Sequence, residues 1–239
     1  LQQLDDDFYF IAECNLGGEY MAEELIDRVK RIGEKTWSRT LDDRVGIANE
    51  ELRRKEREAA RDLPSVEPLL ADRIDHLIEH DVVAFSSDPK NPYGFQFDVP
   101  EYKYNLGEIY NLCISRGTLT AEERFKINDH IVQTIVMLES LPFPKHLERV
   151  PEIAGGHHEK MDGTGYPRKL RGKDMSIPAR VMAIADVFEA LTAADRPYKP
   201  PKKLSESIKI MSSMVEGNHL DPDLFKLFLE SGVYMDYAV

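Results

Sequence analysis

The sequence predicts an all-α fold, a helical bundle preceded by an N-terminal helical extension. Apolar residues recur at helical spacing through most of the chain, and no strand-like run of any length competes with them. Helix start signals stand before several of these stretches, where Ser, Thr or Asp precedes Pro or Glu. Both the periodicity and the expected helix boundaries therefore indicate the same fold class.

The composition is that of a protein with a buried core and a charged surface. A hydrophobic content of 42% in 239 residues is enough for one sizeable domain, or for a domain with a helical appendage. No run of about 18 apolar residues occurs, so no membrane span is expected in this chain. The 43 acidic and 31 basic residues give a formal charge of −12, which repels nucleic acid polymers. A phosphate ligand must therefore be captured by local positive groups.

The two cysteines, Cys14 and Cys113, are too few for a disulfide framework. No secretory leader precedes them, so a cytoplasmic location is predicted. The chain begins at Leu1 and not at Met, which indicates that it was cut from a longer protein.

The N-terminal third is rich in charge. From Glu19 to about Asp62 the pattern predicts one or two long amphipathic helices, and residues 69–80 continue it. A solvated helical face is one interpretation; a dimerising or signal-transmitting stalk, which would make the protein a homodimer, is the other. Three prolines and a glycine between Ser86 and Pro100 predict a loop. We therefore assign residues 1–85 to a helical region or linker that leads to a missing sensor part, and residues 86–239 to a second domain.

The second domain contains several predicted helices. Thr120 and Glu123 form a capping box that opens a helix carrying His130, with apolar positions at Ile127, Ile131, Ile135 and Leu138. Prolines 142 and 144 end it, and a short helix near 146–155 leads into a loop. Ser176 and Pro178 begin the next helix, which runs through Leu191. Two more helices are predicted over 204–216 and 221–231.

Histidines on or beside these helices suggest a metal site. His157 and His158 are adjacent, and consecutive side chains on a helix diverge by about 100°, so they could serve two ions or line two sides of one site. His130 is the natural third imidazole. Taken singly, each of the two adjacent histidines is more often a hydrogen-bonded structural residue than a ligand.

Asp186 lies among apolar neighbours on its predicted helix. An unpaired buried carboxylate would cost several kcal/mol, so Asp186 requires a cation or strong donors. An arginine or a backbone N–H is the structural alternative. Histidine and carboxylate ligands together suit iron or manganese, in sites of the kind used for phosphoester hydrolysis.

Three cations lie within or just after the same helix: Arg180, Arg196 and Lys199. A guanidinium can bind a phosphate through two hydrogen bonds, and Tyr198 between Arg196 and Lys199 would suit a nucleotide base. The alternative is that these cations only interact with the helix C-terminus.

Three segments resemble the motifs of the HD-GYP domain family. They are HHEKMDGTGYP at 157–167, IPARVMAIADVFEALTAADRPYK at 177–199 and GTLTAEERFKINDH at 117–130. The resemblance covers roughly Tyr104 to the C-terminus. It implies a cyclic di-GMP phosphodiesterase, a hydrolase of the HD superfamily with a two- or three-metal site in a helical bundle.

The resemblance also implies roles for individual residues. It places metal ligands at His130, His157, His158 and Asp186. Three of these, His157, His158 and Asp186, would be catalytic. In the mechanism that the resemblance implies, they hold the metal ions whose bridging hydroxide attacks phosphorus. The loop beside the dinucleotide would consist of Gly165, Tyr166 and Pro167. Its phosphates would be held by Arg196 and Lys199, while Arg180 is a ligand-binding candidate from the group of cations described above. Glu159 and Asp162 belong to the motif without an assigned role.

The chain departs from the family at its defining His-Asp pair. The counterpart segment reads YNLGEI from Tyr104 to Ile109, so tyrosine and asparagine replace the pair and Glu108 replaces a lysine. In the family this aspartate bridges the metals, so its loss should leave a site that is incomplete or absent, with one residual ion at most. Upstream, Asp72 and His76 have helical spacing but no clear place among the ligands.

The sequence therefore predicts the output domain of a cyclic di-GMP signalling protein. In the first reading the domain has a degenerate active site and works by binding cyclic di-GMP or a protein partner such as a diguanylate cyclase. In the second it is an active metal-dependent phosphodiesterase with a reorganised metal site.

Overall fold

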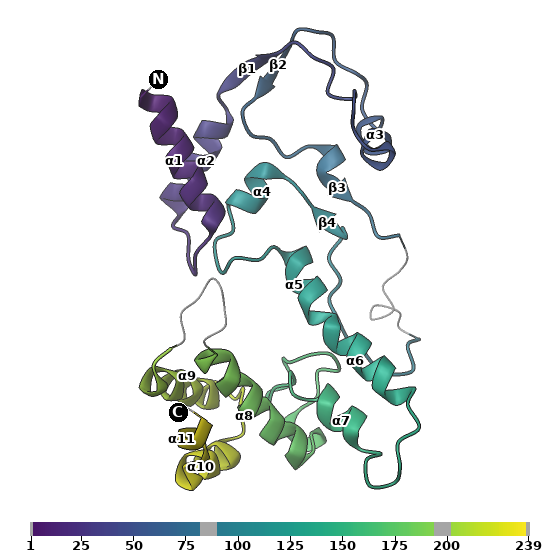
Figure 1. Cartoon of the computed structure of the whole chain (residues 1–239), viewed down its shortest axis with the longest axis vertical. Helices are drawn as coiled ribbons and strands as arrows, with labels where there is room; N and C mark the ends of the chain where they lie inside the picture. Colours follow the sequence, from purple (N-terminus) through teal and green to yellow (C-terminus); the bar gives the residue numbers. More distant parts are fainter. Residues whose placement is uncertain (1, 82–89, 194–201, 238–239) are drawn as a thin grey trace. The chain divides into compact units, whose positions relative to one another are not determined.

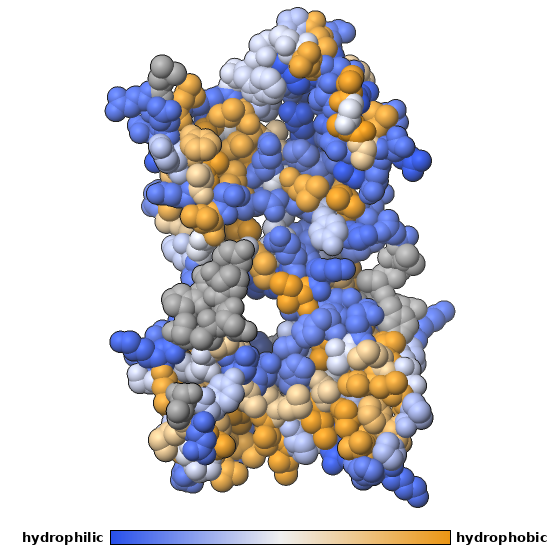
Figure 2. Space-filling view, in the orientation of Figure 1, coloured by the Kyte–Doolittle hydropathy of each residue, from blue (hydrophilic) through white to orange (hydrophobic). Residues whose placement is uncertain are grey.

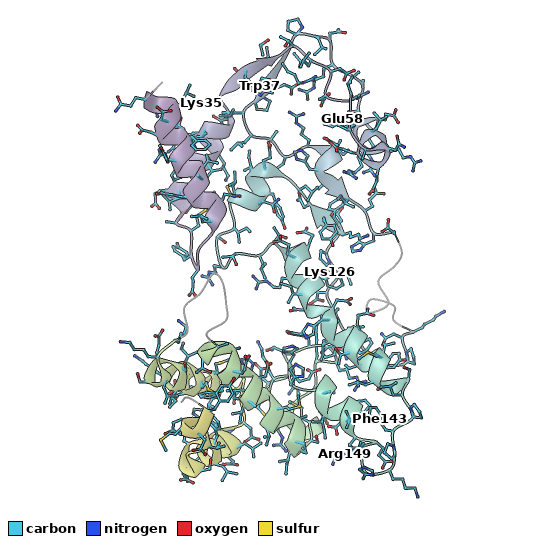
Figure 3. All side chains as sticks on the ribbon, viewed as in Figure 1. Lys35, Trp37, Glu58, Lys126, Phe143 and Arg149 are labelled. Atoms are coloured by element: carbon cyan, nitrogen blue, oxygen red, sulfur yellow. The ribbon has the colours of Figure 1, made fainter. Side chains whose placement is uncertain are left out.

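The computed structural model describes residues 2–81, 90–193 and 202–237, and it is mostly helical (Figure 1). This confirms the predicted fold class. The described residues form two compact units, one containing 2–81 with 100–126 and the other containing 90–99 with 127–237. One of the divisions between them follows Lys126, which Figure 3 labels.

The first unit contains short elements joined by long connections. In chain order they are α1 (Gln2–Leu16), α2 (Glu23–Gly33), β1 (Thr36–Arg39), α3 (Asn49–Lys55), β2 (Ser65–Pro68), the 3-10 helix η1 (Ile74–His76), β3 (Leu77–Ile78), β4 (Tyr104–Asn105), α4 (Glu108–Leu112) and the first part of α5 (Ala121–Asn128). β1 pairs with β2 and β3 with β4, both antiparallel, with Trp37 opposite Glu67 and Leu77 opposite Asn105. Its small apolar core consists of Phe10, Val29, Ile32 and Leu112.

Two helix predictions in this unit are wrong. The helix expected from Glu19 ends at Gly33, and a strand and a short helix follow it before Asp62. Residues 69–80 form only η1 and β3. In that stretch Asp72 Oδ1 accepts hydrogen bonds from the backbone N–H groups of Ile109 and Tyr110, at 3.0 and 3.1 Å. Such side-chain to backbone bonds compete with helix formation, and residue spacing does not reveal them.

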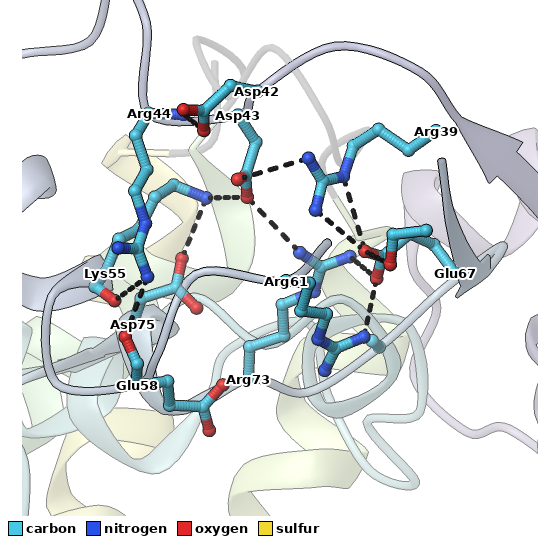
Figure 4. Close-up of polar contacts among 12 residues, drawn as sticks. Arg39, Asp42, Asp43, Arg44, Lys55, Glu58, Arg61, Glu67, Arg73 and Asp75 are labelled. Carbon is cyan, nitrogen blue, oxygen red and sulfur yellow. Dashed lines mark hydrogen bonds and ion pairs between the residues drawn. The ribbon is translucent and has the colours of Figure 1, made fainter. Parts of the chain in front are cut away.

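A network of charged side chains fills part of this unit (Figure 4). The carboxylate of Glu67 is fully buried and is approached by Arg39, Arg61 and Arg73 at N–O distances of 2.9 to 3.2 Å. Lys55 pairs with Asp43 and Asp75 beside it, at 3.0 and 3.2 Å. Buried charges are tolerated only when they are paired in this way. Ion pairs therefore occupy part of the interior that apolar side chains would otherwise fill.

The second unit contains the helices of the C-terminal half, including two short ones over 172–174 and 233–237 that were not predicted. They are α6 (His130–Glu139), α7 (Val150–Gly155), the 3-10 helix η3 (Gly172–Asp174), α8 (Ile177–Thr192), α9 (Leu204–Glu216), α10 (Pro222–Ser231) and α11 (Val233–Tyr237). Ser176 caps α8 and Asp221 caps α10, which confirms both predicted starts. One core cluster lies among α8, α9 and α10, with Met211 and Leu220 almost completely buried.

The helix predicted from Thr120 is interrupted. Its capping box is confirmed, since the Thr120 and Glu123 side chains exchange hydrogen bonds with each other's backbone N–H at 3.2 and 2.9 Å. However, α5 ends at Asn128 and α6 begins at His130. Ile131 and Ile135 are fully buried as predicted, whereas the Ile127 side chain, on the other side of the break, is 52% exposed.

Close packing of α6, α7 and α8 positions the histidines. A Cβ atom on Gly155 would lie 2.7 Å from Ile135 Cγ1, so only glycine lets α7 approach α6 this closely. Figure 2 shows apolar side chains on the surface of this unit. The exposed apolar residues of the unit include Val181 on α8 and Leu227 on α10.

Candidate metal centre and its loop

Three imidazoles lie together in the second unit. His130 is the first residue of α6, and His157 and His158 follow the end of α7. One ring nitrogen from each can be chosen so that all three lie within 4.8 Å of one another. The Nε2 atoms of His130 and His158 are 3.3 Å apart. The structure thus gathers the three histidines singled out in the sequence, and the group could hold a metal ion.

Backbone carbonyl groups orient two of these rings. Nδ1 of His130 donates to the Ile127 carbonyl at 2.5 Å, and Nδ1 of His157 donates to the Ala154 carbonyl at 2.6 Å. A carbonyl oxygen can only accept a hydrogen bond, so Nδ1 carries the proton and the Nε2 lone pair stays free. Metal-binding histidines are commonly oriented by such a bond from their other ring nitrogen.

His158 lies in a more enclosed environment. Burial, followed by the neighbouring His157 and His130, lowers its pKa to about 4, so the ring is neutral at pH 7. Its ring is stacked on Tyr166, with the centroids 4.8 Å apart and 27° between the planes. A neutral imidazole is the form that binds metals.

Asp186 supplies a carboxylate near these rings. Its Oδ2 lies 3.8 Å from Nδ1 of His158, but its side chain is 41% exposed. The expectation that it is buried among apolar residues is therefore wrong, because α8 turns the face with Asp186 and Ala185 partly toward solvent. Its place beside the histidines is as predicted. Imidazole and carboxylate are donors that borderline first-row ions prefer, and the three histidines present fit one such ion, with Asp186 beside them.

The loop after the histidines folds back on itself. Glu159 is 1% exposed, and its carboxylate accepts from the backbone N–H groups of Arg168 and Leu170 at 2.6 and 2.8 Å. Asp162 accepts from the N–H and hydroxyl groups of Thr164, both at 2.8 Å, which shapes the turn. Both motif residues therefore have structural partners that sequence reasoning did not identify.

Gly165, Tyr166 and Pro167 form part of this loop. A Cβ on Gly165 would lie 2.4 Å from the backbone nitrogen of Lys160, so no other residue fits there without a shift of the loop. Pro167 is fully buried, and Tyr166 is half-buried against His158. Burial, and then the negative charge of Asp186, raise the pKa of Tyr166 to about 12.

Within the described residues, no hydrogen bond or ion pair links a predicted phosphate-binding residue to the three histidines. Nη1 of Arg180 pairs with Asp221 Oδ2 at 2.6 Å, which ties α8 to the start of α10. A phosphate would have to compete with that carboxylate, so the pairing argues against the role expected for Arg180. Arg196 and Lys199 lie outside the described residues.

The segment that the sequence analysis aligns with the family's His-Asp pair belongs to the first unit. Tyr104 and Asn105 form β4, and the side-chain oxygen of Asn105 accepts from the Gly107 backbone N–H at 2.9 Å. Asp72 binds backbone amides, as described above, and His76 Nδ1 accepts from the Arg73 N–H at 3.3 Å. Within the described part of the chain, the three-histidine group is the one set of side chains with metal-ligand geometry.

A large apolar pocket that residue spacing did not predict lies beside Asp186. It measures about 870 Å³ and is bounded by α8, α10 and α11. Aromatic side chains such as Phe228 and Tyr234 line it, and Asp186 and Glu189 are its two acidic residues. None of the described helices has the length and hydropathy needed to cross a lipid bilayer.

Several known proteins are similar in sequence to about half of this chain. The chain is 46% identical over 126 residues to the 3'3'-cGAMP-specific phosphodiesterase 1 of Vibrio cholerae, covering 53% of this chain and 25% of that protein. It is 37% identical over 134 residues to a probable cyclic di-GMP phosphodiesterase of Vibrio cholerae, covering 54% and 30%. The cyclic di-GMP phosphodiesterase of Thermotoga maritima is 34% identical over 138 residues, covering 56% and 36%.

These matches span about a quarter to a third of the relatives' own lengths. The family model described as "HD domain" matches residues 64–224, a range that starts before the predicted boundary at residue 86 and includes all three histidines and Asp186. The chain belongs to the HD domain family, and it is similar to cyclic dinucleotide phosphodiesterases of that family.

Proposed function

We propose that this chain is the output domain of a cyclic dinucleotide signalling protein and that it binds its ligand without hydrolysing it. His130, His157, His158 and Asp186 would hold a single iron or manganese ion. The observation that carries the proposal is the donor set itself. In the described residues three imidazoles offer ring nitrogens within 4.8 Å of one another, and Asp186 Oδ2 lies 3.8 Å from Nδ1 of His158. The bridging carboxylate that the HD-GYP resemblance implies would be replaced by Asn105.

Asn105 is poorly suited to bridge two metal ions as a carboxylate would. An amide is neutral and supplies one oxygen, whereas hydrolysis by two metal ions depends on a charged group that holds both ions a few ångströms apart. The Asn105 oxygen already accepts a hydrogen bond from Gly107 N–H. When bound, a single ion would still attract and polarise a phosphoryl oxygen of the ligand.

The protein's own residues would hold the ligand by short-range contacts, because the net charge of −12 repels anions at longer range. The backbone of the Gly165–Pro167 loop lies next to the metal-binding histidines, and we place the dinucleotide against it. Arg196 and Lys199 supply positive charge in the same part of the sequence. A protein partner such as a diguanylate cyclase remains the other ligand class for a binding domain.

An active metal-dependent phosphodiesterase is the second candidate. The names of the relatives, which are 34–46% identical over the matched regions, favour it. It requires a second ion held by residues other than Tyr104 and Asn105.

One experiment separates the two candidates. Purified protein is mixed with Mn²⁺ or Fe²⁺ and with cyclic di-GMP or 3'3'-cGAMP, since relatives are named for both. Calorimetry should show saturable binding, and chromatography should show no linear dinucleotide. His157→Ala should weaken metal and ligand binding, whereas His146→Ala, at an exposed histidine before α7, should not.

Turnover that requires His157 and survives in His146→Ala would contradict the binding role and establish the phosphodiesterase. Failure to bind either dinucleotide in the presence of metal would refute the assignment of the ligand.

A further inference from the structure

Glu159 is a buried charged residue to which no function has been assigned. It directly follows His158 and is 1% exposed. A buried carboxylate is costly unless strong hydrogen bonds compensate for its lost hydration. Each of its two oxygens accepts one backbone N–H, Arg168 at 2.6 Å and Leu170 at 2.8 Å. Hydrogen bonds to a charged acceptor are about twice as strong as neutral ones, so Glu159 ties residues 168–170 firmly to the histidine segment.

Two further contacts hold the same loop against the histidine segment. Gly165 packs so tightly that its missing Cβ would lie 2.5 Å from the Cα of Glu159. The Tyr166 backbone N–H donates to the His158 carbonyl at 3.2 Å. The loop between Glu159 and Leu170 is therefore held against residues 158–160 at both its middle and its end.

This closure bears directly on the His158 ring. His130 and His157 are each oriented by a backbone carbonyl, but in the described part of the chain no carbonyl does the same for His158. Its Nδ1 faces Asp186 at 3.8 Å, and its Nε2 is 3.3 Å from His130 Nε2. Its ring lies against two others, His157 with centroids 4.0 Å apart and Tyr166 at 4.8 Å, and of these two Tyr166 is the stacked one.

We infer that Glu159 is a positioning residue for the metal centre: by binding the amides of Arg168 and Leu170 it holds Tyr166 against His158 and fixes that imidazole as a ligand. The inference rests on the proposed metal site. It adds that the glutamate of the HHE segment acts through the loop and does not itself touch the ion.

The test compares metal binding by Glu159→Gln and by the whole wild-type chain, with Glu148→Gln at an exposed position before α7 as the control. Calorimetry with Mn²⁺ gives the affinity, and the visible absorption of bound Co²⁺ reports its ligand geometry. The glutamine has one carbonyl oxygen, so it satisfies one amide and leaves the other unpaired. We expect Glu159→Gln to weaken metal binding about 10- to 100-fold, as loss of a ligand-orienting partner commonly does, and to alter the Co²⁺ spectrum.

Each result has a distinct meaning. If the wild-type chain binds no metal, the proposed function fails. If it does bind and Glu159→Gln has wild-type affinity and spectrum, the positioning role is overturned. Should Glu159→Gln not fold, as judged by circular dichroism, Tyr166→Leu decides the question. Loss of affinity with a changed spectrum in that variant supports the inference, and wild-type behaviour overturns it.

Discussion

Glu67 provides a sharp test of how the first unit is held together. Its fully buried carboxylate receives hydrogen bonds from three arginines and from Ser65, and β2 places it opposite Trp37 on β1. Glu67→Gln keeps the shape of the side chain but removes its charge and turns an NH₂ group toward guanidinium donors. Breaking a buried ion pair from one side typically costs about 3–5 kcal/mol.

The structure places the expected cost at the lower end of that range. The Arg61 side chain is 54% exposed and can return to water, whereas Arg39 and Arg73 are 11% and 28% exposed and would be left with less hydration. We therefore expect a loss of about 3 kcal/mol, which shifts the urea midpoint by about 1.5 M at a typical slope of about 2 kcal/mol/M.

Fluorescence of Trp37 is a direct assay, because it is the one tryptophan of the chain and lies opposite Glu67 in the same two-stranded sheet. Glu58→Gln, at an exposed glutamate on the rim of the network, is the matched control. Burial raises the pKa of Glu67, but hydrogen bonds from Ser65 and Arg39 and nearby arginine charges outweigh burial and lower it overall. Its contribution is thus fully present above about pH 4.5 and is lost as the pH falls through the folded-state pKa.

The difference between Glu67→Gln and wild type should therefore shrink on acidification. A loss under 1 kcal/mol at pH 7, no larger than that of Glu58→Gln, would refute the view that the ion network stabilises this unit.

Three further predictions concern the second unit. Met211→Ala removes a fully buried side chain from the core among α8, α9 and α10, and should reduce the free energy of unfolding by about 2–5 kcal/mol in urea titrations. Asp221→Ala removes the cap of α10 and the partner of Arg180, and should lower stability by at least about 2 kcal/mol, whereas a change under 0.5 kcal/mol would exclude both roles. Absorbance at 295 nm should show Tyr166 ionising near pH 12, and this ionisation should be missing in Tyr166→Phe. The folded state favours the neutral phenol, because the pKa of Tyr166 is raised above its unfolded value. The stability that Tyr166 contributes in this way should be fully present below about pH 10 and lost as the pH rises further.

Helices whose boundaries depend on local chemistry could be predicted from the sequence. The predicted range 204–216 coincides with α9, and Ser176 and Asp221 cap α8 and α10 as their residue types indicate. The first unit could not be predicted in the same way. Its strands pair residues about 30 positions apart, and Glu67 is stabilised by arginines on separate segments. Those long-range contacts leave no periodic trace in the sequence.

In the candidate site, too, local features could be predicted and long-range contacts could not. His157 and His158 stand out because they are adjacent, and His130 because it lies on an apolar helix. The exposure of Asp186 was mispredicted, since helical spacing does not tell which face of α8 is covered. The partners of Glu159 were missed because they are backbone amides, which every sequence contains. The pairing of Arg180 with Asp221 joins residues 41 positions apart and was likewise invisible.

The most direct test of the account is the number of metal ions per chain. Protein loaded with Mn²⁺ under anaerobic conditions and freed of excess ion by gel filtration is analysed by mass spectrometry for metals, with His158→Ala measured in parallel. We predict one ion per wild-type chain and almost none in the variant. Two or more ions per chain, or one ion that persists without His158, would contradict the proposed single-ion centre.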